Sequence, residues 1–234
     1  GPAVAQADAE IAELRDLAAT DPRFEGAEIT AADLTYLFEK QRRERYDLDD
    51  EVLRPYLELD RVLTEGVFHA AEILYGLTFA PRADLAGYAP GVRVWEVFRE
   101  SPVPGPGAEP EREPIGLFVA DVHARPGKRG GAWAHALVRQ SRLLGTRPVI
   151  VNNLNVRPAA DGQPVLLTWD EVRTCFHEFG HALHGLLSDV RLPSQSGTSV
   201  RRDTVEFPSQ INEIWMTHPR ILSRYAVHHA TGEP

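Results

Sequence analysis

Apolar residues recur at helical spacing near the start of the chain. Leu34, Leu37 and Phe38 share one helix face, and they follow Thr30 and Asp33, two residue types that cap helix starts. The pattern predicts an amphipathic helix in this region. Helices of this kind normally bury their apolar stripe against a core, so we expect it to serve as scaffold.

A longer apolar stripe follows Pro55, a residue suited to the first turn of a helix, and stops at Gly76. Its members are Leu59, Val62, Leu63, Val67, Ala70, Ala71 and Leu74. This stripe also predicts a packing helix.

The middle of the chain changes to the pattern of β-strands. Residues 92–98, 115–122 and 148–156 are rich in β-branched and apolar residues and predict three strands. Residues 101–114 are rich in Pro, Gly and Glu and predict a mobile hairpin loop. The stretch before the third strand is expected to be helical or irregular, with a plain turn at its Gly-rich piece KRGGAW.

A strongly periodic segment follows over residues 168–188. Thr168 and Glu171 have the spacing of a capping box, which marks a helix start. Seven apolar residues then recur every three or four positions and predict a buried helix: Val172, Cys175, Phe176, Phe179, Leu183, Leu186 and Leu187.

The other face of this predicted helix carries the pattern HExxH. His177 and His181 lie four residues apart, which places both imidazoles on one side and lets them converge on one zinc ion. Glu178 lies about 100° round the helix, where it can reach a water molecule at the metal. The arrangement indicates two ligands and one general base for hydrolysis. The alternative is a buried helix whose histidines are satisfied by ordinary hydrogen bonds.

A hydrolytic zinc site needs a third protein ligand. Glu206 is the best candidate, because it precedes another apolar-periodic segment with Ile211, Ile214 and Trp215, and a Gly-containing loop lets the chain return. Glu213 is the competing carboxylate, and it lies two turns further on.

Composition narrows the function classes. The chain has 234 residues with a formal net charge of -9, which argues against a nucleic-acid partner. Its one cysteine, Cys175, fits a reducing compartment, and we expect a cytoplasmic location. No apolar run is long enough to span a membrane. We infer no obligate protein partner.

The strings FHEFGHALHGLLS and SGTSVRRDTVEFPSQINEIW resemble the M3 family of zinc oligopeptidases, most closely its peptidyl-dipeptidase branch. The segments RRERYDLDDEVLRPYLELDRVLTEGVF, VRVWEVF, DVHAR and KRGGAW extend the resemblance over most of the chain. The resemblance implies that His177, His181 and Glu206 bind one zinc ion and that Glu178 is the catalytic base. Short peptides would be the substrates.

Three further residues near the predicted site have candidate roles. His184 matches a family position, with a role either in supporting the ligands or in contacting substrate. Arg202 and Asp203 can orient Glu206, or they can form a simple surface ion pair. Thr204 departs from the family, which has an aromatic residue after Arg-Asp.

The expected fold is mainly helical with a small β-sheet (α+β), containing a zincin-like core within a larger helical protein. Residues 1–80 form a helical scaffold segment, and residues 81–234 form the catalytic segment. The family places its oxyanion-stabilising Tyr and His groups beyond the part that this chain matches. Three functions are therefore open: a zinc peptidase that releases C-terminal dipeptides or cleaves internally, a zinc-binding but catalytically incomplete fragment, and an interaction module with a coincidental HExxH.

Overall fold

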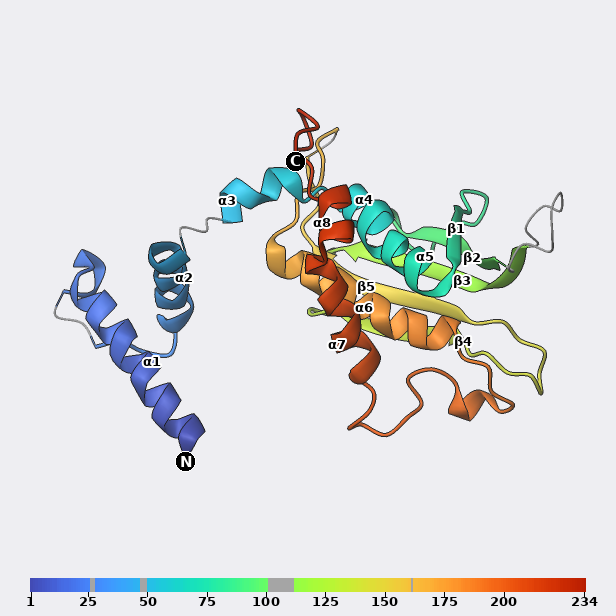
Figure 1. The fold of residues 1–234 in the computed structure, drawn as a ribbon, viewed down its shortest axis with the longest axis horizontal. Coiled ribbons are helices and arrows are strands. Elements are labelled where there is room, and N and C mark those ends of the chain that lie inside the picture. The colour runs from blue at the N-terminus through green and yellow to red at the C-terminus, as the bar shows by residue number, and fades with distance from the viewer. Residues whose placement is uncertain (26–27, 47–49, 101–111, 161) are drawn as a thin grey trace. The chain divides into compact units, whose positions relative to one another are not determined.

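The computed structural model describes the chain except residues 26–27, 47–49, 101–111 and 161, and it divides into two compact units. The first unit, Gly1–Val52, contains α1 (Pro2–Ala19), a 3-10 turn (Pro22–Phe24) and α2 (Leu34–Tyr46) (Figure 1). A small core of Leu14, Ala18 and Leu37 joins the two helices. The predicted helix is confirmed, since α2 begins directly after Asp33.

The second unit, Leu53–Pro234, opens with the helical run predicted from the long apolar stripe. The short helix α3 (Asp50–Leu53) contains the division between the two units, and a 3-10 turn follows it at Arg54–Tyr56. Next, α4 (Leu59–Arg61), a π-helical segment (Val62–Phe68) and α5 (His69–Tyr75) follow without a break. Gly76 ends the run with a φ of 64°, a left-handed conformation that glycine adopts without strain. This run belongs to the same compact unit as the sheet, and the functional boundary at residue 80 stays a prediction.

Within the described residues, five strands form one sheet in the order β1-β2-β3-β5-β4. Their bounds are β1 (Leu77–Pro81), β2 (Arg93–Glu100), β3 (Arg112–His123), β4 (Trp133–Val138) and β5 (Val149–Val156). Strands β3 and β5 are parallel, and the other pairs are antiparallel. The three predicted strands are confirmed as β2, β3 and β5. The loop predicted over residues 101–114 lies mostly outside the described residues, and its last three residues belong to β3.

The expectation of a helical or irregular stretch before β5 is confirmed only in part: residues 124–132 and 139–148 belong to no helix or named strand, but β4 lies between them. Strand β4 is at the edge of the sheet, where β5 is its one neighbour in the part of the chain that the structure describes, and much of it is solvent-exposed. Its sequence, WAHALV, therefore lacks the clear alternation of a half-buried strand. Strand β5, by contrast, is interior between β3 and β4, so it offers no free edge.

One face of the sheet packs on the helices through aromatic side chains. Phe118 of β3 contacts Phe68 of the π-helical segment and Phe179 of α6 (Trp169–Leu186), with ring centroids 5.8 and 5.1 Å apart. Figure 1 shows α5 and α6 on the same side of the sheet. The chain is thus a mixed helix-and-sheet protein with a small sheet.

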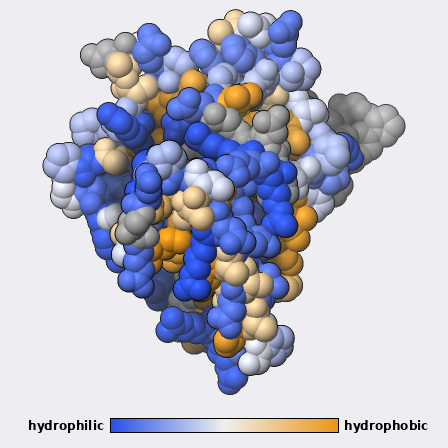
Figure 2. Space-filling view, turned by 90° about the vertical axis from the view of Figure 1, so that its left-hand side faces the viewer, coloured by the Kyte–Doolittle hydropathy of each residue, from blue (hydrophilic) through white to orange (hydrophobic). Residues whose placement is uncertain are grey.

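The chain ends with short helices connected by loops. After a 3-10 turn at Pro193–Gln195 come α7 (Phe207–Ile214), a second turn (Trp215–Thr217) and α8 (Pro219–Tyr225). Among the described residues, no helix is both long and apolar enough to cross a membrane. Hydrophilic residues dominate the face drawn in Figure 2, with smaller hydrophobic patches between them.

Candidate metal centre

Helix α6 starts where the capping box predicts. The Glu171 N–H donates to the Thr168 hydroxyl over 3.1 Å, and the Thr168 N–H donates to the Glu171 carboxylate over 2.8 Å. Each pair satisfies a backbone donor that the first helical turn leaves open. The apolar face of α6 is buried in the main core, which fixes the direction of the opposite face.

Helix α7 runs back along α6, since its partners on α6 move from Gly180 to Phe176 as the chain advances. A Cβ at Gly180 would lie 2.6 Å from the Cα of Ser209, so the two helices can approach this closely only because residue 180 has no side chain. One turn further on, the Asn212 amide donates to the Phe176 carbonyl over 2.7 Å. These contacts set the register that brings both helices to one site.

The apolar periodicity of this second helix is misleading about its packing. Ile211 and Ile214 are 39% and 66% exposed, whereas Ser209 and Asn212 are buried against α6. The helix therefore packs through a small residue and an amide. Glu206 stands at its N-terminal end and faces the two histidines.

Three of the predicted residues meet at one point. Oε2 of Glu206 lies 3.2 Å from Nε2 of His177 and 3.1 Å from Nε2 of His181. The ligand atoms of the three residues all lie within 4.8 Å of one another. Atoms bound to one tetrahedral zinc at 2.0–2.1 Å would be about 3.4 Å apart, so this donor set fits the ion that the sequence predicts.

Glu213 is not a member of this cluster, but it contacts it. Its Oε1 lies 2.6 Å from Nδ1 of His177. An ionised carboxylate can only accept, so this contact holds the proton on Nδ1 and leaves the Nε2 lone pair facing Glu206 and His181. Sequence reasoning considered Glu213 only as a rival third ligand. Its spacing of seven residues from Glu206, two helical turns on the same face, is the signal that could have placed it beside the site.

Glu178 is 6% exposed and lies next to the cluster in sequence. Its Oε2 has no hydrogen-bond partner within the described part of the chain. Burial raises the pKa of Glu178 to about 7; the neighbouring His177 opposes this rise, and Glu206 adds to it. A buried carboxyl group with one free oxygen is suited to exchange a proton with a small molecule in the site.

The pKa values of His181 and Glu206 shift toward the forms that bind metals. Burial lowers the pKa of His181, which favours the neutral imidazole that binds metals. Burial opposes ionisation of Glu206, but the Ser209 hydroxyl and the two histidines outweigh it and hold its pKa below the usual range. The shift of His181 increases its neutral fraction near neutral pH, and the shift of Glu206 keeps its carboxylate ionised to lower pH.

The remaining candidate residues are less closely tied to the cluster. His184 is partly buried, burial lowers its pKa, and its Nδ1 has no partner among the described residues. Arg202 and Asp203 are exposed, and within the described ranges no hydrogen bond or ion pair joins either of them to Glu206. Their roles stay predictions.

A cavity of about 150 Å³ lies between the edge strand β4 and helix α6. Its lining includes Ala134, His135 and Ala136 from β4, His181 from α6, and Ser196 and Thr198 from the following loop. The cavity thus connects the exposed edge of the sheet with one histidine of the cluster.

Comparison with known proteins gives a consistent result. The family model described as "Peptidase family M3" matches residues 2–234 of the chain. The dipeptidyl carboxypeptidases of Salmonella typhimurium and Escherichia coli are 50% and 49% identical over 89% and 86% of this chain. Oligopeptidase A of Salmonella typhimurium is 38% identical over 98% of the chain. The chain spans 29%, 28% and 32% of the length of these three relatives.

These matches confirm the resemblance deduced from the two motif strings and their flanking segments. They extend it to nearly the whole of the chain, including the helical first unit. The chain belongs to peptidase family M3.

Proposed function

We propose that this chain is the zinc-binding and catalytic core of a metallopeptidase, with His177, His181 and Glu206 as ligands and the fold of a zincin. One observation carries the proposal: three ligand atoms converge from two packed helices, with Glu206 at 3.1–3.2 Å from both imidazoles. A chance HExxH in a structural helix would not require a carboxylate from another helix at this position. The interaction-module alternative therefore loses its support.

A zinc ion held there supplies Lewis acidity, which makes a water molecule a stronger acid and polarises a peptide carbonyl. Glu178 accepts the proton of the attacking water and passes it to the leaving amine. Its burial and its unpaired oxygen support this role. Glu213 orients His177 through Nδ1, as carboxylates commonly do for ligating histidines.

The peptide binds along β4 in this proposal. Strand β4 has a free edge, and the cavity beside it reaches His181. An extended peptide can add to such an edge through backbone hydrogen bonds, which bind many sequences alike. Strand β5 lies between β3 and β4 and has no free edge for a peptide.

We further propose that the product is a C-terminal dipeptide. The support is likeness to proteins named dipeptidyl carboxypeptidase at 49–50% identity, compared with 38% for an oligopeptidase A. Internal cleavage of short peptides is the alternative within the family. In either case the substrates are short peptides, and the cytoplasmic location stays a prediction.

Hydrolysis of an N-terminally blocked tetrapeptide, followed by mass spectrometry, tests the proposal. We expect cleavage two residues from the C-terminus that stops with a zinc chelator and returns with added zinc. The Glu178→Gln variant should bind zinc as the wild type does and lose hydrolysis. Equal hydrolysis by this variant and the wild type would refute the assigned base.

A second candidate is a segment that binds zinc but hydrolyses slowly. It is favoured by the surroundings of the histidines that follow Glu206, which are candidates to stabilise an oxyanion. Within the described residues, His218, His228 and His229 contact residues outside the cluster. Stoichiometric zinc without cleavage of the tetrapeptide would select this candidate.

A further inference from the structure

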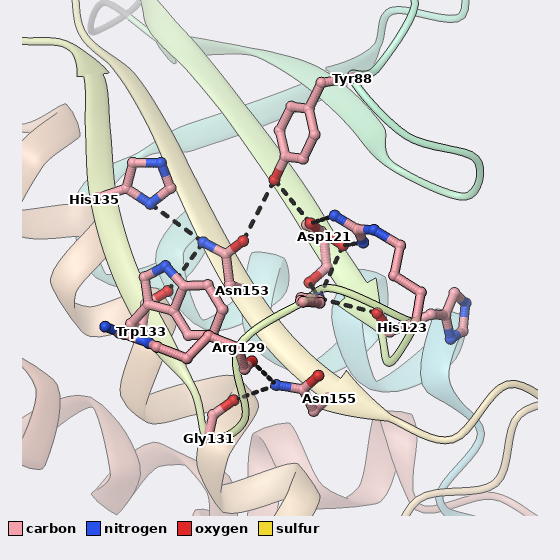
Figure 3. A network of polar contacts seen from close by, with 11 residues as sticks. Tyr88, Asp121, His123, Arg129, Gly131, Trp133, His135, Asn153 and Asn155 are labelled. Atoms are coloured by element: carbon pink, nitrogen blue, oxygen red, sulfur yellow. Dashed lines mark hydrogen bonds and ion pairs between the residues drawn. The ribbon is translucent and has the colours of Figure 1, made fainter.

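The face of the sheet that points away from α6 carries a polar network (Figure 3). Phe118, Ala120 and Val122 of β3 belong to the core on the helix side. Side chains alternate along a strand, so Asp121 points to the opposite face. There it meets residues from three other parts of the sheet and its loops.

Asp121 is the centre of this network and is 2% exposed. It accepts two hydrogen bonds from Arg125, at 2.6 and 2.7 Å, and one from the Tyr88 hydroxyl at 2.8 Å. The Lys128 ammonium, whose side chain is 3% exposed, donates to the Asp121 carboxylate and to the carbonyls of Asp121 and His123. A buried ion pair is stable only when its remaining donors and acceptors are satisfied, and this one meets that condition.

The loop that carries Arg125 and Lys128 leads directly into the edge strand β4. Asn155 of β5 holds the end of this loop nearest β4, because the Asn155 amide donates to the carbonyls of Arg129 and Gly131 over 2.8 and 2.6 Å. One strand position earlier on the same face, Asn153 donates to the Trp133 carbonyl over 3.3 Å and lies 3.2 Å from Nδ1 of His135. Figure 3 shows Asp121, Asn153 and His135 on the neighbouring strands β3, β5 and β4, with Asn155 further along β5 beside Arg129 and Gly131.

An edge strand forms backbone hydrogen bonds with one neighbouring strand only, so its position also depends on contacts with side chains and loops outside the sheet's hydrogen-bond ladder. Helix α6 packs near β4 from one side, and the network holds the loop and the strand from the other. The cavity beside His181 is lined by the same strand. A shift of β4 would therefore change the edge that receives a peptide without moving the helices that hold the metal ligands.

We propose that Asn155, together with the Asp121–Lys128 pair, is a positioning device that holds β4 in the place required for peptide binding. Within the described residues, the Asn155 side chain hydrogen-bonds to the carbonyls of Arg129 and Gly131 and to none of the candidate metal ligands, so it acts through those two carbonyls. This inference rests on the proposed function, because it assigns the peptide to β4.

The test uses the zinc-loaded full chain and the variant Asn155→Asp, which keeps the size of the side chain and removes both donors. We expect amide hydrogen exchange in β4 to accelerate by about fivefold or more, as loss of a hydrogen bond usually allows. KM for the blocked tetrapeptide should rise by a similar factor, about fivefold, while kcat and the zinc dissociation constant change by less than about twofold.

Glu96→Gln is the matched control. The Glu96 carboxylate on β2 accepts a hydrogen bond from Arg82 over 2.8 Å, near the other edge of the sheet. The substitution therefore weakens a side-chain contact that is far from β4 in the strand order. This variant should leave KM and β4 exchange at wild-type values.

If Asn155→Asp binds zinc normally and either its amide hydrogen exchange in β4 or its KM is unchanged, the positioning role of Asn155 is refuted and the proposed function is not affected. A proportional fall in kcat and zinc affinity would also refute the positioning role, because it would indicate general damage. A wild-type chain that fails to bind zinc or to cleave the peptide would instead refute the proposed function, and with it the role of β4.

Discussion

Glu213 holds the Nδ1 side of His177, with 2.6 Å between its carboxylate oxygen and the ring nitrogen. The contact joins the last turn of α7 to the middle of α6. It selects the tautomer whose Nε2 is free to bind a metal. The geometry of the cluster therefore depends on a fourth residue that is not itself a candidate ligand.

We expect Glu213→Gln to weaken zinc binding by about 10–100-fold, the usual effect of losing such a partner. Competition with a zinc-chelating dye measures the dissociation constant. Glu72→Gln is the control, since Glu72 makes the same type of contact with Nδ1 of His69 at 2.9 Å on α5. A dissociation constant in Glu213→Gln no higher than in this control would show that Glu213 does not support the ligand.

The close approach of α6 and α7 predicts the effect of Gly180→Ala. The added Cβ would meet the Cα of Ser209 at 2.6 Å and the Pro208 carbonyl at 2.8 Å, both backbone atoms that cannot turn aside. We expect a loss of about 1–3 kcal/mol in the free energy of unfolding, as in other overpacked sites. Zinc binding should weaken too, because α7 carries Glu206.

Urea denaturation gives the free energy of unfolding of Gly180→Ala, and dye competition gives its zinc affinity. Gly130→Ala serves as control, since nothing lies within 4 Å of a Cβ there. If Gly180→Ala is as stable as Gly130→Ala and binds zinc equally well, the two helices do not pack as described.

The sequence indicated the chemistry of the site better than its packing. The capped helix and the HExxH spacing follow from local patterns, because ligand spacing along one helix needs no tertiary information. Glu206 belongs to a second helix, and we expected it from its place before the next apolar-periodic segment and from the resemblance to the M3 family. The face that α7 turns to α6 does not follow. Ile211 and Ile214 suggest that α7 packs on α6 through apolar side chains. Ser209 and Asn212 form the contact instead, because Gly180 lets the two backbones approach closely. The role of Glu213 depends on that same packing.

The sheet shows the same limit. Strands with buried apolar residues, such as β3 and β5, are visible in the sequence, and the exposed edge strand β4 is not. Which strand has the free edge depends on strand order. Pairing between segments far apart in the sequence sets the strand order, and the hydrophobic periodicity within one segment carries no information about that order.

Asp121 predicts a specific pH dependence of stability. Burial alone would raise its pKa, but Arg125, Lys128 and Tyr88 outweigh burial and hold the pKa well below the usual range. A carboxyl group with a lower pKa in the folded state stabilises fully above its unfolded pKa of about 3.9, and this contribution is lost as pH falls below that value. We expect the free energy of unfolding to fall steeply below about pH 4 in the wild type and less steeply in Asp121→Asn.

Urea titrations at pH 7 and at several values below pH 4 measure this difference. At pH 7, Asp121→Asn should lose about 3–5 kcal/mol, because the Lys128 charge stays buried without its partner. Asp84→Asn, which changes an exposed partner of Arg82, should lose less than about 1 kcal/mol. Parallel pH profiles for the wild type and Asp121→Asn would contradict the assignment.

The central claim is that His177, His181 and Glu206 bind one zinc ion together. Native mass spectrometry of the purified chain, equilibrated with zinc and then freed of excess metal, measures it most directly. We expect one zinc per wild-type chain and none retained by His181→Ala, with the folded charge-state distribution unchanged. A wild-type chain without zinc, or a His181→Ala chain that retains it fully, would contradict the account.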